Sequence, residues 1–169
     1  MIEAKSKECA DGRGDRVTSG PEVPDEEDNM HANPALREIR DLLQRSDTVA
    51  VVGLSDRPYR TSHAIAGALQ GFGFKIFPVN PNLHSPVLGE EPYESVQDIP
   101  IPVDIVDVFR RSGKVMPVAE DAVAAGARVL WMQSGVINEE AAAYAEEHGL
   151  TVVMDRCIKV DYARLVGVS

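Results

Sequence analysis

The amino-acid sequence predicts an α/β fold, a doubly wound and mostly parallel sheet of the Rossmann-like, three-layer αβα kind. Short apolar runs alternate with segments whose apolar residues recur at helical spacing. Strands that alternate strictly with helices imply right-handed crossovers, which place helices over both faces of a parallel sheet. The first apolar run ends at Gly53 and gives way to a polar loop before helical spacing resumes, as in the first βα turn of such sheets.

Residues 1–33 are predicted to form a disordered acidic tail. They have almost no large apolar side chain, so they cannot bury enough surface to offset the entropy of ordering. Nine acidic and four basic residues in this segment account for half of the net charge of −10. The Rossmann-like domain itself is predicted to span residues 34–169.

An amphipathic helix is predicted to lead into the sheet. Asn33 is expected to cap this helix and Pro34 to occupy its first position, because both residue types favour helix starts. We expect its apolar stripe to pack on the domain. That stripe consists of Leu36, Ile39, Leu42 and Leu43.

Strands and helices then follow in alternation. Apolar runs bounded by polar turns predict strands at 48–53, 74–79, 103–108, 128–133 and 151–154. Helical spacing predicts helices at about 62–71, 113–125, 138–148 and 158–166. Asn138, followed by two glutamates, suits a helix start. The Pro-rich loop after the second strand is expected to hold a short strand near Val87 and Leu88.

Composition excludes several classes of protein. The 169 residues, 44% hydrophobic and 26% charged, suit one globular domain with a full core. No apolar run approaches the roughly 18 residues of a membrane span and the N-terminus lacks a signal-peptide pattern, so we expect a cytoplasmic protein. Cys9 and Cys157 lack metal-ligand spacing, so neither a disulfide framework nor a metal site is predicted. The acidic balance argues against nucleic-acid binding, which requires a basic face.

Ligands of parallel sheets bind beyond the carboxyl ends of the strands, so the segments after each predicted strand form the candidate site. These segments are residues 53–58, 78–81, 109–112, 133–136 and 155–157, and we expect them to converge. The first aims backbone N–H groups and a helix N-terminus at one point, which predicts an anion site for a nucleotide phosphate. A glycine that only makes the turn is the alternative. The polar side chains beside that point are Ser55, Arg57, Arg60, Thr61 and Ser62.

Two features narrow the choice of nucleotide. The loop after Gly53 matches neither the G-x-G-x-x-G nor the Walker pattern. The second strand ends in Val79-Asn80-Pro81, with no carboxylate where NAD enzymes bind the ribose hydroxyls. A ribose that carries phosphate fits this end better, which leaves coenzyme A and NADP. The guanidinium groups that could share the phosphate charges belong to Arg57, Arg60, Arg110, Arg111 and Arg156.

Five ordered motifs indicate a family. They are Gly53-x-Ser55-x-x-Pro58-x-Arg60-x-Ser62, Pro78-Val-Asn-Pro81, Val103-Asp-Ile-Val-Asp-Val-Phe109-Arg110, Trp131-Met-Gln133-Ser-Gly135-Val and Val153-Met-Asp155-Arg156-Cys157. With these motifs, residues 34 to about 166 resemble the small stand-alone CoA-binding proteins, relatives of the CoA-binding domain in the alpha subunit of succinyl-CoA synthetase. The resemblance implies binding of coenzyme A, or of an acyl-CoA, at the carboxyl edge of the sheet.

The same resemblance implies a role for each segment. The first loop would hold the diphosphate, residues 78–81 with Phe109 and Arg110 would border the adenosine, and residues 133–136 and 155–157 would line the pantetheine end. The implied cofactor-binding residues are Gly53, Leu54, Ser55, Pro58, Arg60, Thr61, Ser62, Pro78, Val79, Asn80, Pro81, Phe109, Arg110, Gln133, Ser134, Gly135, Val136, Asp155, Arg156 and Cys157.

Some of these residues also have simpler structural interpretations. Asn80 equally suits a bond to its own backbone within its turn, and Trp131 is expected in the core because it lies inside a strand. Asp104 and Asp107 are expected to face polar neighbours at strand edges. Cys157 is the candidate reactive thiol, able to form a mixed disulfide with coenzyme A, because an adjacent cation and a helix N-terminus favour the thiolate; a buried packing role is the alternative.

No catalytic residue is predicted. The histidines form no evident pair with a nucleophile, and 169 residues leave no room for the nucleotide-grasping domain that an acyl-CoA synthetase needs. The resemblance to the synthetase therefore covers only its ligand-binding domain. We expect a protein that binds a small molecule, without established catalysis. The alternatives are an NADP-dependent oxidoreductase and an interaction module that responds to CoA and recruits a protein partner.

Overall fold

Five parallel strands form one sheet in the computed structural model of the chain, which describes residues 30–167. The strands are β1 (Thr48–Val52), β2 (Lys75–Val79), β3 (Ile105–Val108), β4 (Val129–Met132) and β5 (Thr151–Val153). Their order across the sheet is β2-β1-β3-β4-β5, and every neighbouring pair is parallel. The predicted doubly wound α/β fold is therefore confirmed, while all but the last residues of the predicted tail lie outside the described residues.

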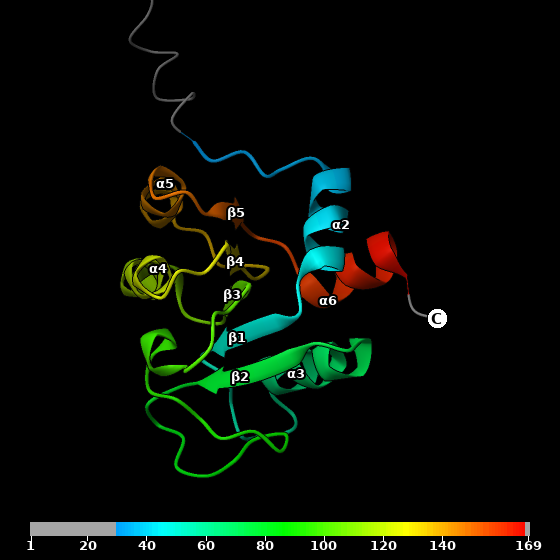
Figure 1. Cartoon of the computed structure of the whole chain (residues 1–169), viewed down its shortest axis with the longest axis vertical. Helices are drawn as coiled ribbons and strands as arrows, with labels where there is room; N and C mark the ends of the chain where they lie inside the picture. The colour runs from blue at the N-terminus through cyan, green and yellow to red at the C-terminus, as the bar shows by residue number, and fades with distance from the viewer. Residues whose placement is uncertain (1–29, 168–169) are drawn as a thin grey trace, which may run out of the picture. The chain divides into compact units, whose positions relative to one another are not determined.

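Helices cover both faces of this sheet (Figure 1). On one side lie α4 (Val115–Ala124) and α5 (Glu139–Glu147), with the short 3-10 turns η3 (Val96–Asp98) and η4 (Ser112–Lys114) leading into that layer. On the other side lie α2 (Leu36–Arg45), α3 (Thr61–Phe72) and α6 (Ile158–Asp161), which continues into a π-helical turn, η5 (Tyr162–Val166). None of the helices among the described residues is long and apolar enough to cross a membrane.

Alternation along the strands divides the core into two clusters, because successive side chains of a strand point to opposite faces. On β3, Val106 and Val108 pack with α4 and α5. Ile105 packs with α2, α3 and α6, in the same cluster as Trp131. Apart from the exposed first residues of β2 and β5, the strands are buried or partly buried on both faces, as expected for a parallel sheet between two helical layers.

The start of the first helix differs from the prediction. Helix α2 begins at Leu36 with Ala35 as its N-cap, so Pro34 precedes the helix and Asn33 does not cap it. Instead, Asn33 Nδ2 donates to Met154 O at 3.0 Å and Asn33 Oδ1 accepts from Met154 N at 2.8 Å. The amide side chain thus pairs with backbone groups just beyond β5, which a local helix rule cannot foresee. The predicted cap of α5 is confirmed, since Asn138 Oδ1 accepts from Ala141 N at 2.9 Å.

The loop between β2 and β3 contains more structure than expected. The predicted strand near Val87 and Leu88 is only an isolated bridge between Val87 and Glu90, and Leu88 has a φ of 54°. Further along, Tyr93 forms an isolated parallel bridge with Val79. This second bridge brings the residues that follow Tyr93 to the carboxyl edge of the sheet.

Candidate functional site

The five segments that follow the strands meet at one edge of the sheet, as predicted. The four segments after β1, β3, β4 and β5 are each bonded through the backbone to the end of the neighbouring strand, and the segment after the edge strand β2 completes the row. The bonds are Gly53 N to Val79 O (2.8 Å), Phe109 N to Val52 O (2.8 Å), Gln133 N to Val108 O (3.4 Å) and Arg156 N to Met132 O (3.3 Å).

The strand order reverses at β1, which places a crevice between the loops that follow β1 and β3. Gly53 and Phe109 face each other across this crevice. Gly53 has a φ of +89°, and a Cβ atom at this position would lie 2.4 Å from Phe109 O. Both the left-handed backbone and the close approach require glycine here. Gly53 is therefore needed for the shape of the crevice.

A small cleft of about 420 Å³ opens on the α3 side of the crevice. Ser62 Oγ accepts from Ser55 N at 3.0 Å, and Ser55 Oγ accepts from Arg57 N at 3.1 Å, so the two serines fix the loop around the cleft. Because α3 begins at Thr61, its first N–H groups and the positive end of its dipole point to this space. Its lining residues are Gly53, Ser55, Tyr59, Arg60, Thr61, Ser62 and Phe109. This set, with one cation, three hydroxyl-bearing residues beside a tyrosine and a helix start, suits an anion.

A large cleft of about 620 Å³ opens on the α4 side. Buried or partly buried apolar residues, among them Val52, Val79 and Val96, contribute to its lining, and Phe109 lines this cleft as well as the small one. Its charged lining residues are Glu94, Arg110, Arg111, Lys114 and Asp121. An apolar lining beside three cationic side chains suits a planar ring that carries a phosphate group.

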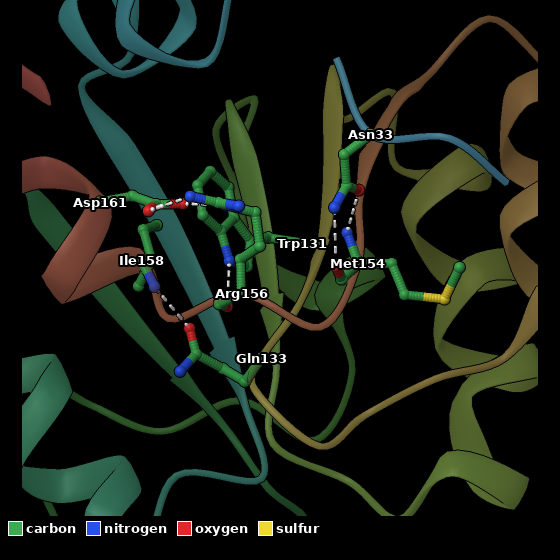
Figure 2. A network of polar contacts seen from close by, with 7 residues as sticks. All are labelled: Asn33, Trp131, Gln133, Met154, Arg156, Ile158 and Asp161. Carbon is green, nitrogen blue, oxygen red and sulfur yellow. Dashed lines mark hydrogen bonds and ion pairs between the residues drawn. The ribbon is translucent and has the colours of Figure 1, made fainter. Parts of the chain in front are cut away.

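The segments after β4 and β5 form a corner at the far end of the edge. The buried Gln133 accepts through Oε1 from Ile158 N at 3.0 Å, which ties β4 to the start of α6. Asp155, with a φ of 62°, accepts from Gly135 N at 2.7 Å. Trp131 is fully buried, as predicted, and its Nε1 donates to Arg156 O at 2.8 Å. Figure 2 shows the bond between Gln133 and Ile158 and the bond between Trp131 and Arg156.

Arg156 is held within the corner by an ion pair. Its Nε and Nη2 atoms donate to Oδ2 and Oδ1 of Asp161 at 2.6 and 2.8 Å, and Asp161 is buried on α6 (Figure 2). The hydrogen bond to Asp161 raises the pKa of Arg156 above its usual value. Of the five arginines expected to share phosphate charge, this one is thus already bidentate with a carboxylate of its own chain.

The family model described as CoA binding domain matches residues 47–163. The chain belongs to the CoA binding domain family. This agrees with the resemblance drawn from the five motifs, all of which lie within the matched range.

Three known proteins illustrate what this member of the CoA binding domain family is similar to. An uncharacterized protein, YneT of Bacillus subtilis (strain 168), is 50% identical over 131 residues, which are 78% of this chain and 96% of YneT. A hypothetical protein from Pyrococcus horikoshii OT3 is 35% identical, with a TM-score of 0.76 over 81% of this chain and 99% of that one. A dinucleotide forming acetyl-coenzyme A synthetase of Ca. Korarchaeum cryptofilum, solved in complex with phosphate and ADP, is 26% identical with a TM-score of 0.59. It covers 69% of this chain, whereas the match covers 28% of the synthetase chain.

The residues implied by the CoA-binding resemblance fall into three groups. Gly53, Ser55, Arg60, Thr61, Ser62, Val79, Pro81, Phe109 and Arg110 line one or both of the two clefts. Gln133, Ser134, Gly135, Val136, Asp155, Arg156 and Cys157 make up the corner after β4 and β5. Leu54, Pro58, Pro78 and Asn80 line neither cleft.

Two residues of this third group, Leu54 and Asn80, stabilise the loops that carry the clefts. Leu54 is fully buried in the core. Asn80 Nδ2 donates to Leu54 O at 3.0 Å, and Asn80 Oδ1 accepts from Asn82 N at 3.0 Å. The simpler interpretation of Asn80, a bond within its own turn, therefore holds alongside a second bond that joins the loops after β1 and β2. Cys157 is partly buried at the N-cap of α6, and its reactivity stays a prediction.

The two strand aspartates differ from each other. Asp104 accepts through Oδ2 from the backbone N–H groups of Asp47 and Thr48 at 2.7 and 3.2 Å, so it has the polar neighbours that were expected. For Asp107 that expectation is wrong. Its side chain is fully buried, and neither of its oxygen atoms has a hydrogen-bond partner in the part of the chain that the structure describes. Strand position alone could not distinguish the two, because both lie in one apolar run.

Sequence reasoning missed several cleft residues. Tyr59 is 77% exposed and lines the small cleft, while Lys114 lines the large one from the end of η4. Glu94, Ser95 and Val96 line the large cleft from the loop after β2. They reach it because Tyr93 N donates to Pro78 O and Asn80 N donates to Tyr93 O, both at 2.9 Å. The sequence has no signal for this non-local pairing, whereas Lys114 could have been found from its place at the start of the helix predicted at about 113–125.

Proposed function

We propose that this protein binds coenzyme A, or an acyl-CoA, along the carboxyl edge of the sheet. The diphosphate lies in the small cleft, the adenosine lies in the large cleft, and the pantetheine arm runs toward the corner after β4 and β5. The observation that carries this proposal is that the two clefts meet at Phe109, which lines both. Membership of the CoA binding domain family supports it.

The chemistry of each cleft fits the part of the ligand assigned to it. Phosphate groups are stabilised by the N-terminus of α3 and by Arg60 at the small cleft. An adenine ring buries apolar surface against Val79 and Val96 in the large cleft. The cations of that cleft then lie beside the ribose, where coenzyme A carries its phosphate monoester. The chain is acidic overall, so these local cations, and not its net charge, hold the ligand.

NADP is the second candidate, because its ribose also carries a phosphate. The loop after β2 supports both, since its amide residue, Asn80, stands where NAD enzymes have a carboxylate. The two ligands differ in what lies beyond the diphosphate, a pantetheine arm or a nicotinamide ribose. The binding experiment below distinguishes them. If coenzyme A binds, truncation at Asn33 then tests whether the preceding segment recruits a partner in response.

Isothermal calorimetry and thermal unfolding should be measured with coenzyme A, acetyl-CoA, NADP and NAD. A ligand that binds only the folded state stabilises it by about 2.7 kcal/mol at one hundred times its Kd. We expect coenzyme A or acetyl-CoA to raise the melting temperature and NAD to leave it unchanged. A shift with NADP and none with coenzyme A would overturn the proposal.

Two arginine variants locate the diphosphate. Arg60→Ala removes an exposed guanidinium from the small cleft, and Arg37→Ala removes an exposed guanidinium from α2, a helix that contributes no residue to the lining of either cleft. Hydrogen bonds to charged groups contribute about 1.5–3 kcal/mol, so Arg60→Ala should weaken coenzyme A binding on the order of tenfold to one hundredfold. Arg37→Ala should bind as the wild type does. Equal affinity of Arg60→Ala and wild type would exclude this assignment of the diphosphate.

A further inference from the structure

Asp107 is a buried carboxyl group at the centre of the sheet. It lies in β3, the middle strand, where its side chain is 0% exposed and neither oxygen atom has a hydrogen-bond partner among the described residues. An ionised carboxylate without a partner is far more costly to bury than the neutral acid. Burial accordingly raises the pKa of Asp107 well above its ordinary value. The side chain of Asp107 therefore holds its proton more tightly in the folded protein than in the unfolded chain.

The position of Asp107 relates it directly to the crevice. Its partners in the sheet register are Val51 on β1 and Trp131 on β4. Two residues further along the same strands come Gly53 and Phe109, which line the small cleft, and Gln133. Because side chains alternate along a strand, Asp107 lies on the same face as Phe109, one strand repeat of roughly 7 Å below the floor of the small cleft.

The charged groups around Asp107 do not offset a negative charge there. The buried residues of α2 are Ile39, Leu42 and Leu43, and those of α3 are Ser62, Ile65, Ala66 and Leu69, so neither helix buries an ionisable side chain. Helix α6 contributes Asp161, whose carboxylate is paired with Arg156, and the partly buried Cys157. The guanidinium of Arg156 is thus already paired with the carboxylate of Asp161.

We propose that ligand binding in the crevice is linked to the proton on Asp107, so that the protonated protein binds tightly and the deprotonated protein binds weakly. This inference rests on the proposed function, since it concerns the same site. A diphosphate in the small cleft repels a negative charge one strand repeat below it, through a core that screens little. For unit charges at such a separation and an effective dielectric constant near 20, the weakening is on the order of tenfold or more. By linkage, bound ligand also makes the proton on Asp107 harder to remove.

The test is the affinity for coenzyme A, measured by calorimetry from acidic to alkaline pH, for wild type and Asp107→Asn. The Kd values of the two proteins are compared as a ratio, wild type over Asp107→Asn, and we expect this ratio to rise on the order of tenfold from acidic to alkaline pH. The reason is that the amide of the variant has no proton to lose. The ionisations of coenzyme A itself contribute equally to both profiles and cancel in their ratio. Identical profiles would overturn the inference. Absence of binding to the wild type at every pH would instead overturn the proposed function.

A measurement on the unmodified protein covers the case in which Asp107→Asn fails to fold. The carboxyl carbon of Asp107 can be followed by carbon NMR as the pH is changed, with and without saturating coenzyme A. We expect its titration to move to higher pH when coenzyme A is bound, by about one unit for a tenfold linkage. An unchanged titration would refute the linkage even though coenzyme A binds.

Discussion

The guanidinium of Arg156 binds both carboxylate oxygens of Asp161, at 2.6 and 2.8 Å, across the turn that joins β5 to α6. Asp161 is almost fully buried, whereas the side chain of Arg156 is 30% exposed. The backbone of Arg156 is fixed as well, because its carbonyl accepts from the indole N–H of Trp131. The pair therefore anchors the corner of the candidate site to the core, with a structural role that is independent of any ligand.

Removing one partner of this pair should destabilise the fold. Arg156→Ala leaves the carboxylate of Asp161 buried without its counter-ion, and we expect a loss of about 3 kcal/mol, the lower part of the range for buried pairs because Arg156 is partly exposed. The double variant Arg156→Met/Asp161→Leu should recover most of this loss, since it buries no charge. Urea unfolding of both variants provides the measurement. A double variant as unstable as the single one would show that the pair itself is not the cause.

The close approach of Gly53 to Phe109 predicts a site-specific effect of one methyl group. Gly53→Ala places a Cβ atom 2.4 Å from Phe109 O and forces alanine into a left-handed backbone. Gly126→Ala is the matched control, because Gly126 also has a positive φ of 77° but its Cβ atom would meet nothing within 4 Å. We expect the control to lose about 1–2 kcal/mol from backbone strain alone. Gly53→Ala should lose about 1–3 kcal/mol more from overpacking.

Ligand binding separates these two glycine variants further. Because the clash moves the loops that form the crevice, Gly53→Ala should bind coenzyme A at least about tenfold more weakly, while Gly126→Ala should match the wild type. Calorimetry on both folded variants checks this. Equal weakening by the two would indicate a general loss of stability and would contradict a role for Gly53 in the site.

We expect Lys114 to contribute to recognition of the phosphate monoester of coenzyme A. It lines the large cleft at an exposed position, so an ion pair with phosphate there contributes up to about 1 kcal/mol. Lys114→Ala should weaken binding of coenzyme A by up to about fivefold and leave binding of 3′-dephospho-CoA unchanged. In contrast, Arg60→Ala should weaken both ligands alike, since both carry the diphosphate. A loss of equal size for both ligands in Lys114→Ala would remove the lysine from the monoester site.

The arrangement of the candidate site could be predicted from the sequence because it follows from sheet geometry. Once the apolar runs are taken as parallel strands, the segments after Val52, Val79 and Val108 must lie at one edge, and the structure joins them by backbone hydrogen bonds. Hydrophobic periodicity is local information, and it is enough for this result.

The wall of the large cleft could not be predicted in this way. It depends on Tyr93, whose backbone pairs with Pro78 and Asn80 after a loop without regular structure. The partner of Asn33 is 121 residues away, so its helix-start pattern was misleading. The lack of a partner for Asp107 likewise depends on which side chains the other strands and helices bring to it.

Substitution of Asn33 is expected to lower the stability of the fold in a pattern that differs from the loss of a helix cap. The Asn33 amide both donates to and accepts from the backbone of Met154, so Asn33→Ala should cost about 1–2 kcal/mol, and Asn33→Asp should cost at least as much because its second carboxylate oxygen faces the carbonyl oxygen of Met154 and cannot donate to it. For a helix cap, aspartate would replace asparagine without loss. Thermal unfolding of the two variants decides between these roles. Full stability of Asn33→Asp would favour the cap.

Because of Asp107, we expect the free energy of unfolding to fall as the pH rises. The unfolded chain loses the proton of an aspartate above about pH 4, whereas burial raises the pKa of Asp107 in the folded state well above that value. The contribution of the neutral acid is thus fully present below about pH 4 and is lost as the pH rises through the folded pKa, at about 1.4 kcal/mol per pH unit in between. Urea unfolding at a series of pH values should show this slope in the difference between wild type and Asp107→Asn. The difference between wild type and Asp107→Val should have the same slope with pH, because valine also lacks the titrating proton. Parallel pH profiles of stability for the wild type and both variants would mean that Asp107 is ionised in the folded protein.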